Sequence, residues 1–153
     1  MVWKPNVTVA AVIERDGKFL LVEEEIEGKL RLNQPAGHLE ADETLVDAVA
    51  RETLEESAWH FRPTHLVGIY HWQRPERDIK GGDITFLRFT FTGEALGCEA
   101  GRRLDDGIVA ARWLTLAEIR ANRARHRSPL VLRGIEDWLA GRRYPLDLLV
   151  HCA

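Results

Sequence analysis

Alternating apolar and polar residues near the start of the chain predict a pair of strands. Val7 to Ile13 alternate and are rich in β-branched side chains, which favour strands. Asp16-Gly17 is typical of a tight hairpin turn, and Lys18 to Glu25 continues as the return strand. A second turn at Glu27-Gly28-Lys29 leads into a short strand from Leu30 to Gln34.

The hydrophobic period changes after Thr44, and the new spacing predicts a helix from about Leu45 to Glu56. Thr44 and Asp47 form a T-x-x-D capping pattern, in which the threonine oxygen accepts from a backbone N–H of the first turn. Small and apolar residues recur at three- and four-residue steps and therefore share one side of the helix: Val46, Val49, Ala50, Thr53 and Leu54.

Beyond this helix the pattern predicts three more strands and two helices. Arg62-Pro63 is expected to break the chain before the first of these strands. The strands are Leu66 to Trp72, Ile84 to Phe91 and Ile108 to Trp113, with loops at Arg74 to Gly82 and Glu94 to Gly107. Thr115 to Glu118 caps a short helix, and Ser128-Pro129 begins a last helix that ends near Ala140. This order indicates an α/β domain with a mixed sheet between helices.

Composition places the chain among soluble globular proteins of one domain. It has 153 residues, of which 45% are hydrophobic and 29% charged. The net charge of −3 gives no reason to expect a stable nucleic-acid partner or binding to an anionic membrane. Cys98 and Cys152 lack metal-ligand spacing and are expected to be free thiols. Without a signal peptide or an apolar span, the protein is expected in the cytoplasm, and no sequence feature specifies an oligomeric state.

Three carboxylates of the predicted helix lie on one face. Glu52, Glu55 and Glu56 are spaced at i, i+3 and i+4, and each close like-charge pair costs about 0.2–0.5 kcal/mol. A hard divalent cation would reverse that sign, because Mg²⁺ takes carboxylate and water oxygens. Arg51, four residues before Glu55, could orient a carboxylate. The alternative interpretation is an acidic helix face that is simply solvated.

The residues around this face resemble the Nudix box, G-x5-E-x7-R-E-U-x-E-E-x-G-U, where U is a bulky apolar residue. Gly37 opens the pattern, Glu43 follows six residues later, and Arg51-Glu52 and Glu55-Glu56 stand at the required offsets before Trp59. Two positions depart from the pattern: Thr53 replaces an apolar residue and Ala58 replaces the second glycine. If position 58 needs a left-handed backbone, alanine costs about 1–2 kcal/mol there.

The resemblance implies the fold, the metal and the residues of the reaction. It implies an α/β/α Nudix sandwich over residues 4–127, with the box at 37–59 and a helical extension at 128–153 packed on the same domain. Mg²⁺, for which Mn²⁺ could substitute, would be held by Gly37, Glu52, Glu55 and Glu56. Arg51 and Glu43 would support that geometry, so the catalytic set is Glu43, Arg51, Glu52, Glu55 and Glu56.

Segments outside the box are similar to NudJ-type phosphatases. The similar segments are Val7 to Ala10, Gly17 to Glu24, Asn33 to Val46, Thr85 to Phe89, Ser128 to Leu130 and Arg143 to Leu146. The resemblance implies hydrolysis of nucleoside tri- and diphosphates or of hydroxymethylpyrimidine pyrophosphate, a thiamine-pathway intermediate, with release of orthophosphate. A dinucleotide polyphosphate or ADP-ribose pyrophosphohydrolase is the enzymatic alternative. A nucleotide-sensing regulator that does not hydrolyse its ligand is the alternative of another class.

Four residues outside the box are candidates for binding a small phosphorylated substrate. Trp72 could stack on a ring and Arg74 could pair with phosphate, although packing in the core or at the rim is an equal alternative. Asn33 and Gln34 could hydrogen-bond the ring. The resemblance to Nudix enzymes also implies that Asp105 or Asp106 could supply an extra carboxylate, as a metal ligand or as a base, the alternative being a plain turn at Asp-Asp-Gly.

Overall fold

The computed structural model describes all 153 residues. The fold consists of two sheets with helices on both sides. The strands are β1 (Asn6–Val12), β2 (Glu14–Arg15), β3 (Lys18–Ile26), β4 (Lys29–Asn33), β5 (Ala36–His38), β6 (Trp59–Gln73), β7 (Thr85–Cys98), β8 (Ile108–Thr115) and β9 (Tyr144–Pro145). The helices are α1 (Leu45–Ser57), α2 (Leu116–Ala121) and α3 (Leu130–Leu139), with short 3-10 turns η1 (Arg123–Arg125) and η2 (Leu146–Leu148). None of the helices is long and apolar enough to cross a membrane.

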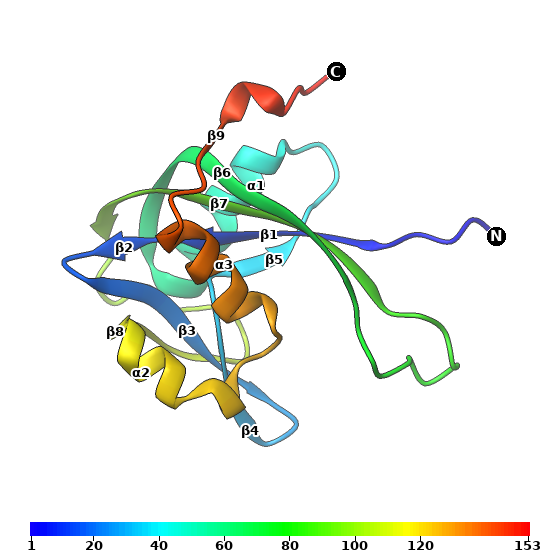
Figure 1. Cartoon of the computed structure of the whole chain (residues 1–153), viewed down its shortest axis with the longest axis horizontal. Coiled ribbons are helices and arrows are strands. Elements are labelled where there is room, and N and C mark those ends of the chain that lie inside the picture. The colour runs from blue at the N-terminus through cyan, green and yellow to red at the C-terminus, as the bar shows by residue number, and fades with distance from the viewer.

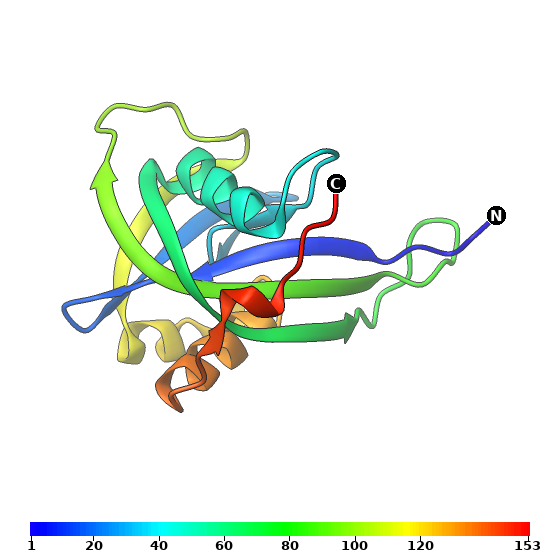
Figure 2. The same ribbon diagram turned by 90° about the horizontal axis from the view of Figure 1, so that it is seen from above.

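The larger sheet is mixed and has the strand order β5-β1-β7-β6-β9. β1 runs parallel to β7, while the β1–β5 and β6–β7 pairs are antiparallel. The second sheet contains β2, β3 and β4, and β8 pairs with β3 on its other side. Figures 1 and 2 show α1 on one face of the larger sheet and the C-terminal helices on the opposite face. The predicted α/β/α sandwich with a mixed sheet is therefore confirmed.

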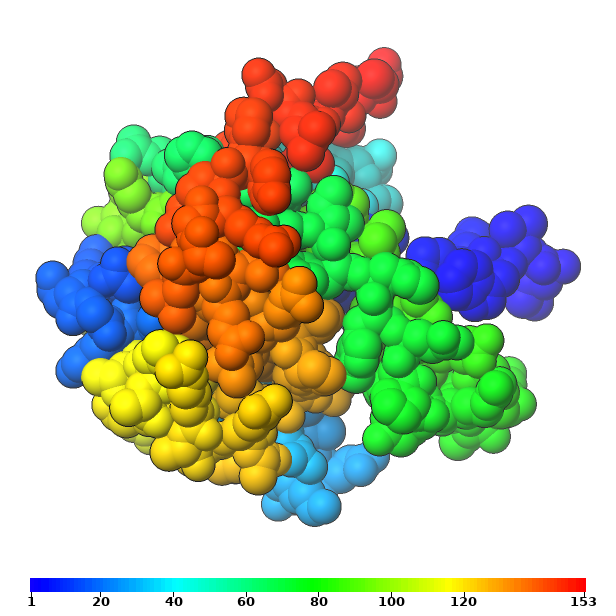
Figure 3. Space-filling view, viewed as in Figure 1, coloured from blue at the N-terminus to red at the C-terminus, as the bar shows by residue number.

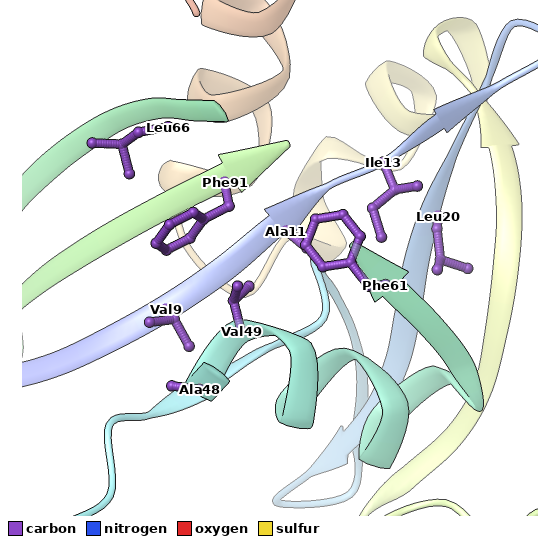
Figure 4. Close-up of a cluster of buried hydrophobic side chains, with 9 residues drawn as sticks. All are labelled: Val9, Ala11, Ile13, Leu20, Ala48, Val49, Phe61, Leu66 and Phe91. Carbon is purple, nitrogen blue, oxygen red and sulfur yellow. The ribbon is translucent and has the colours of Figure 1, made fainter. Parts of the chain in front are cut away.

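Alternation along β1 divides the core into two layers. Val9, Ala11 and Ile13 point toward α1, where they pack with Val49 and Phe91 (Figure 4). Val12 points the other way and packs beside Ile119 of α2 and Ile135 of α3. Because successive strand residues face opposite sides, one strand supplies both layers. The apolar stripe of α1 also includes Ala48, which is fully buried against the sheet.

The structure corrects the expected ends of two long strands. β6 begins at Trp59 and continues through Pro63, and β7 extends to Cys98 instead of ending near Phe91. The ladder between them shifts register between Pro63 and His65, because proline cannot donate a ladder hydrogen bond and is tolerated at such bulges. Gly93 allows the close approach, since a Cβ there would lie 2.0 Å from the Arg62 carbonyl oxygen.

Helix α1 ends in a left-handed residue that is not glycine. Ala58 has φ 63° and ψ 10°, and its N–H donates to the carbonyl oxygen of Leu54 at 2.9 Å. This is the single hydrogen bond of an αL C-terminal cap, a position that glycine fills without steric cost. The backbone strain that the sequence raised as a question at this position is therefore present.

We expect Ala58→Gly to stabilise the protein. Relief of the left-handed strain should exceed the loss of one methyl contact and the greater freedom of glycine in the unfolded chain, for a net gain of about 0.5–1 kcal/mol. Thermal unfolding should show a melting temperature higher by about 1–4 °C. Ala140→Gly is the matched control, because Ala140 follows α3 with right-handed angles, φ −71° and ψ −2°, and should gain nothing. A lower melting temperature for Ala58→Gly would contradict the prediction.

Candidate active site

Arg51 links the carboxylates at one end of the large sheet. Its Nε and Nη2 donate to the two oxygens of Glu43 at 2.9 and 2.7 Å, a bidentate pair. Its Nη1 donates to Glu52 Oε1 at 2.9 Å and to Glu55 Oε2 at 3.2 Å. Nη2 also donates to the His38 carbonyl oxygen at 3.1 Å, which ties α1 to β5. A single guanidinium therefore fixes the orientation of three carboxylates.

Glu52, Glu55 and Asp105 bring ligand oxygens together. One carboxylate oxygen of each residue lies within 4.8 Å of those of the other two. The Asp105 backbone N–H donates to the Glu55 carbonyl oxygen at 3.0 Å, which holds the β7–β8 loop against α1. Asp106 is fully exposed and lies 3.6 Å from Arg103. Of the two aspartates proposed from the sequence, the structure thus brings Asp105 to the cluster.

Gly37 of β5 lies directly against the Glu52 carboxylate. A Cβ at position 37 would be 2.1 Å from Glu52 Cδ and 2.2 Å from Oε1, so no side chain fits while Glu52 holds its place. β5 is hydrogen-bonded to β1, with Gly37 opposite Val9, which fixes the position of the glycine. The glycine that opens the box is therefore required for close approach of backbone and carboxylate.

The chemistry of this cluster fits a hard divalent cation. Arg51 uses only Oε1 of Glu52 and Oε2 of Glu55, and the second oxygen of each carboxylate makes no hydrogen bond. Carboxylate oxygens are the ligands that Mg²⁺ takes in proteins, and Mg²⁺ keeps further positions for water and phosphate oxygens. Glu52, Glu55 and Asp105 would hold the ion, while Arg51 keeps two of them in place.

Glu56 lies next to the cluster without being one of its converging carboxylates, and it lines a pocket together with Glu52. Its Oε1 accepts from the Ala36 backbone N–H at 2.8 Å. Burial raises the pKa of the Glu56 carboxyl to about 8, and the negative charges of Glu52, Glu24 and Asp105 add to the effect. Burial likewise raises the pKa of Glu52 to about 7, although the Arg51 hydrogen bond opposes it. Both carboxyls thus titrate near neutral pH.

The pocket next to Glu56 has a volume of about 450 Å³ and extends from the carboxylates toward the start of α3. One wall comes from β6 and β7, where the rings of Trp72 and Phe86 stack with centroids 5.7 Å apart. Cationic side chains from three segments complete it: Arg74, Arg88 and Arg127. A space of this size suits a small ring compound with phosphates.

A second hollow adjoins this pocket. Figure 3 shows the surface recessed between the segment before α3 (orange), the β3–β4 turn (light blue) and the β6–β7 loop (green). Trp72, Arg74 and Arg127 line both spaces, so they form the boundary between them. The pocket and the second hollow therefore adjoin at these residues.

Three of the four candidate substrate-binding residues line the pocket and one does not. Asn33, Trp72 and Arg74 line the pocket. Gln34 does not, because its side chain is buried and donates from Nε2 to the Val131 carbonyl oxygen at 2.7 Å. Gln34 instead faces Arg88, whose Nη2 donates to Gln34 Oε1 at 3.0 Å.

Sequence reasoning did not assign four charged residues to the pocket: Glu24, Glu40, Arg88 and Arg127. Arg88 had a detectable signal, since it occupies the same face of its alternating strand as Phe86 and Thr90 and is therefore an inward-facing charge. Glu24 and Arg127 had only a weak signal, because each is one of several like charges in a row: the first run could hold a metal ion and the second could meet a phosphate, but neither run indicates which residue does so. Glu40 had none.

Three consecutive glutamates, Glu23 to Glu25, predict a solvated strand end, but Glu23 is buried. It pairs with Arg112 of β8 and, at 2.6 Å, with Arg125 of η1. The run of basic residues at 120–127 predicts a solvated helix end by its sequence, but through Arg125 it contributes an ion pair to the buried Glu23. Both oxygens of Glu23 are occupied by arginines, so Glu23 offers no free oxygen to a metal ion, whereas Glu52, Glu55 and Asp105 form a candidate metal site.

Comparison with known proteins agrees with this geometry. The sequence model of the family described as the NUDIX domain matches residues 3–133. The chain is 44% identical over 147 residues to the Escherichia coli K12 protein named phosphatase NudJ, covering 96% of this chain and 92% of that protein. A solved Nudix hydrolase from Nitrosomonas europaea is 53% identical with a TM-score of 0.89, covering 97% and 98% of the two chains. A MutT Nudix hydrolase from Burkholderia pseudomallei, 21% identical with a TM-score of 0.67 over 88% and 98%, shares the fold.

Proposed function

The chain belongs to the Nudix hydrolase family, and from that membership we propose that it is a Mg²⁺-dependent phosphatase of small phosphoanhydrides that carry a heteroaromatic ring. The observation that carries the proposal is that the acidic cluster and the pocket are connected. Oxygens of Glu52, Glu55 and Asp105 converge within 4.8 Å, and the pocket that Glu52 and Glu56 line extends from them to Trp72 and three arginines.

Different residues of the site have different roles in the proposed reaction. A divalent ion bound at the cluster supplies Lewis-acid polarisation of phosphoryl oxygens and lowers the pKa of water. Glu56 lies beside the cluster with one oxygen free of hydrogen bonds, so it is placed to take a proton from the attacking water. Arg51 and Glu43 keep the carboxylates in one geometry before substrate arrives.

The substrate class follows from the remainder of the pocket and from the relatives. Trp72 and Phe86 offer a flat apolar surface that accepts different rings, because every such ring has a π-face. The likeness to a protein named phosphatase NudJ over 96% of the chain supports a phosphatase activity. Nucleoside tri- and diphosphates and hydroxymethylpyrimidine pyrophosphate are the substrates that the NudJ-type segments of the sequence lead us to propose. Release of one terminal phosphate at a time is the expected outcome.

Product analysis tests the proposal. Purified protein with Mg²⁺ should convert GTP to GDP and orthophosphate, and hydroxymethylpyrimidine pyrophosphate to its monophosphate and orthophosphate. Direct release of GMP and pyrophosphate would assign the chain to the pyrophosphohydrolases of the family instead. Tight nucleotide binding without turnover would favour a sensing role, and preferred cleavage of ADP-ribose or of dinucleotide polyphosphates would shift the substrate class.

Mg²⁺ should stabilise the protein more at pH 8 than at pH 6. The pKa values of Glu52 and Glu56, about 7 and 8, lie above the ordinary 4.5, so their ionised forms destabilise the metal-free fold. Stability of the metal-free protein should therefore fall as pH rises from about 5 to 8. Mg²⁺ needs ionised ligands, and at about 100 times its Kd it should add about 2.7 kcal/mol, or roughly 5–10 °C, at pH 8.

Thermal melts with EDTA or Mg²⁺ at the two pH values measure this effect. A Glu52→Gln/Asp105→Asn double variant removes two of the three converging carboxylates and should lose the Mg²⁺ response. Retention of the full response in that variant would place the ion elsewhere.

A further inference from the structure

Arg88 is a buried cation that has no anionic partner in the protein. Four charged side chains are buried: Glu23, Glu52, Arg88 and Asp137. The three acids each pair with at least one arginine, whereas Arg88 makes no ion pair with any carboxylate. Burying an unpaired guanidinium is costly, because it gives up water without gaining a counter-charge. That cost points to an anion that is supplied from outside the chain.

The surroundings of Arg88 hold the guanidinium in place without neutralising it. Nη2 donates to Asn33 Oδ1 at 3.2 Å and to Gln34 Oε1 at 3.0 Å, both neutral acceptors. Gln34 is itself held by its hydrogen bond to Val131 at the start of α3. The other N–H groups of Arg88 make no hydrogen bond to the protein and are available to a ligand.

The charge persists at neutral pH and faces the pocket. Burial lowers the pKa of Arg88 to about 10, which leaves the group protonated at pH 7. Arg88 lies on β7 two residues from Phe86, on the same side of the strand, and both line the pocket. Glu56 is the carboxylate whose charge acts on it, and Glu56 also stands next to the acidic cluster.

The charge lining the pocket therefore changes along its length, from Glu52 of the acidic cluster, past Glu56, to Arg88. We propose that Arg88 binds a phosphate group of the substrate directly, without a metal ion, while a phosphate at the other end would be held through a divalent ion bound at the carboxylate cluster. This inference rests on the proposed function, since it assigns the second end of the same substrate site. It also gives Asn33 and Gln34 a positioning role toward Arg88 in place of contact with the ring.

The direct test is binding of pyrophosphate to the metal-free protein. Isothermal titration in EDTA should show pyrophosphate binding to the wild-type protein. Arg88→Gln keeps an amide that can donate to Asn33 and Gln34 but removes the charge, and it should weaken pyrophosphate binding by about 10- to 100-fold. Arg88→Lys keeps the charge without the planar fork and should recover part of that loss. Arg120→Gln, an exposed arginine of α2 outside the pocket, is the matched control and should bind as the wild type does.

Three results would overturn the inference. Equal pyrophosphate affinity of wild type and Arg88→Gln would leave Arg88 a packing role. Loss of affinity for guanosine in Arg88→Gln, with unchanged pyrophosphate binding, would assign the guanidinium to the ring. Equal losses in Arg88→Lys and Arg88→Gln, with melting temperatures lowered alike, would mean that the substitutions disturb the fold and that charge is not what matters.

Kinetics separate this inference from the proposed function. If Arg88 holds a phosphate equally in the ground and transition states, Arg88→Gln should raise KM by about 10-fold or more and change kcat little. Protein that binds pyrophosphate through Arg88 but hydrolyses no phosphoanhydride would refute the proposed activity and leave the binding role standing. Turnover of phosphoanhydrides with an Arg88→Gln KM equal to that of the wild type would support the proposed activity and refute the phosphate-binding role of Arg88.

Discussion

Replacing Glu56 with glutamine is expected to lower kcat/KM for phosphoanhydride hydrolysis by about 10²- to 10⁴-fold while the protein remains folded. Glu56 has a pKa raised by burial to about 8, and one of its oxygens makes no hydrogen bond, so it can accept a proton near neutral pH. Glutamine has the same shape and still offers an oxygen to the Ala36 N–H, 2.8 Å away in the native protein. It cannot take a proton, so the loss should fall on the chemical step.

Thermal melting distinguishes a loss of kcat/KM in Glu56→Gln from unfolding of the variant. Because the ionised form of Glu56 is the unfavourable one in its buried site, Glu56→Gln should melt at the same or a higher temperature at pH 8 without metal. Glu94→Gln is the matched control, since Glu94 is an exposed residue of β7 whose pair with Arg62 should contribute little. Activity of Glu56→Gln within a few-fold of the wild type would show that another group accepts the proton.

Gly37→Ala is expected to reduce kcat/KM by at least about 100-fold. The added methyl carbon would stand 2.1 Å from Glu52 Cδ, so the carboxylate has to leave its position between Gly37 and Arg51. Displacement of a reactive group by about 1 Å can cost 10²-fold in rate. The free energy of unfolding should change far less, by about 1 kcal/mol, since a glutamate side chain can turn toward solvent. The Mg²⁺-dependent rise in melting temperature should shrink together with the activity.

A second substitution and a control test whether displacement of Glu52 causes the loss of activity in Gly37→Ala. Gly37→Ala/Glu52→Asp shortens the side chain that meets the new methyl group and should recover part of the Mg²⁺ response. Gly97→Ala places the same methyl group on β7, where no atom lies within 4 Å, and should leave activity unchanged. Full activity in Gly37→Ala would mean that Glu52 works from a second position.

The sequence by itself determined the features that depend on neighbouring residues. Periodicity located α1 almost to its ends, because Thr44 caps it through the Asp47 N–H at 3.0 Å and the apolar stripe is local. The same spacing placed Glu52, Glu55 and Glu56 on one side of the helix, whereas the question of a left-handed residue at Ala58 came from the resemblance to the Nudix box, whose second glycine it replaces. The carboxylate face follows from the helical repeat and the strain at Ala58 from backbone sterics, and both act over a few residues.

Tertiary structure alone decided which distant groups meet. Asp105 rather than Asp106 joins the cluster, because a loop hydrogen bond to Glu55 brings it there. Pairing with β7 carries β6 through Pro63, where the local signal predicted a break. Gln34 turns into the protein toward Val131 and Arg88, which lie 97 and 54 residues away along the chain. Arg51 hydrogen-bonds Glu55 but not the next residue, Glu56, which accepts from the Ala36 N–H instead. Such pairings depend on strand register and close packing across the whole chain, and local residue preferences do not encode them.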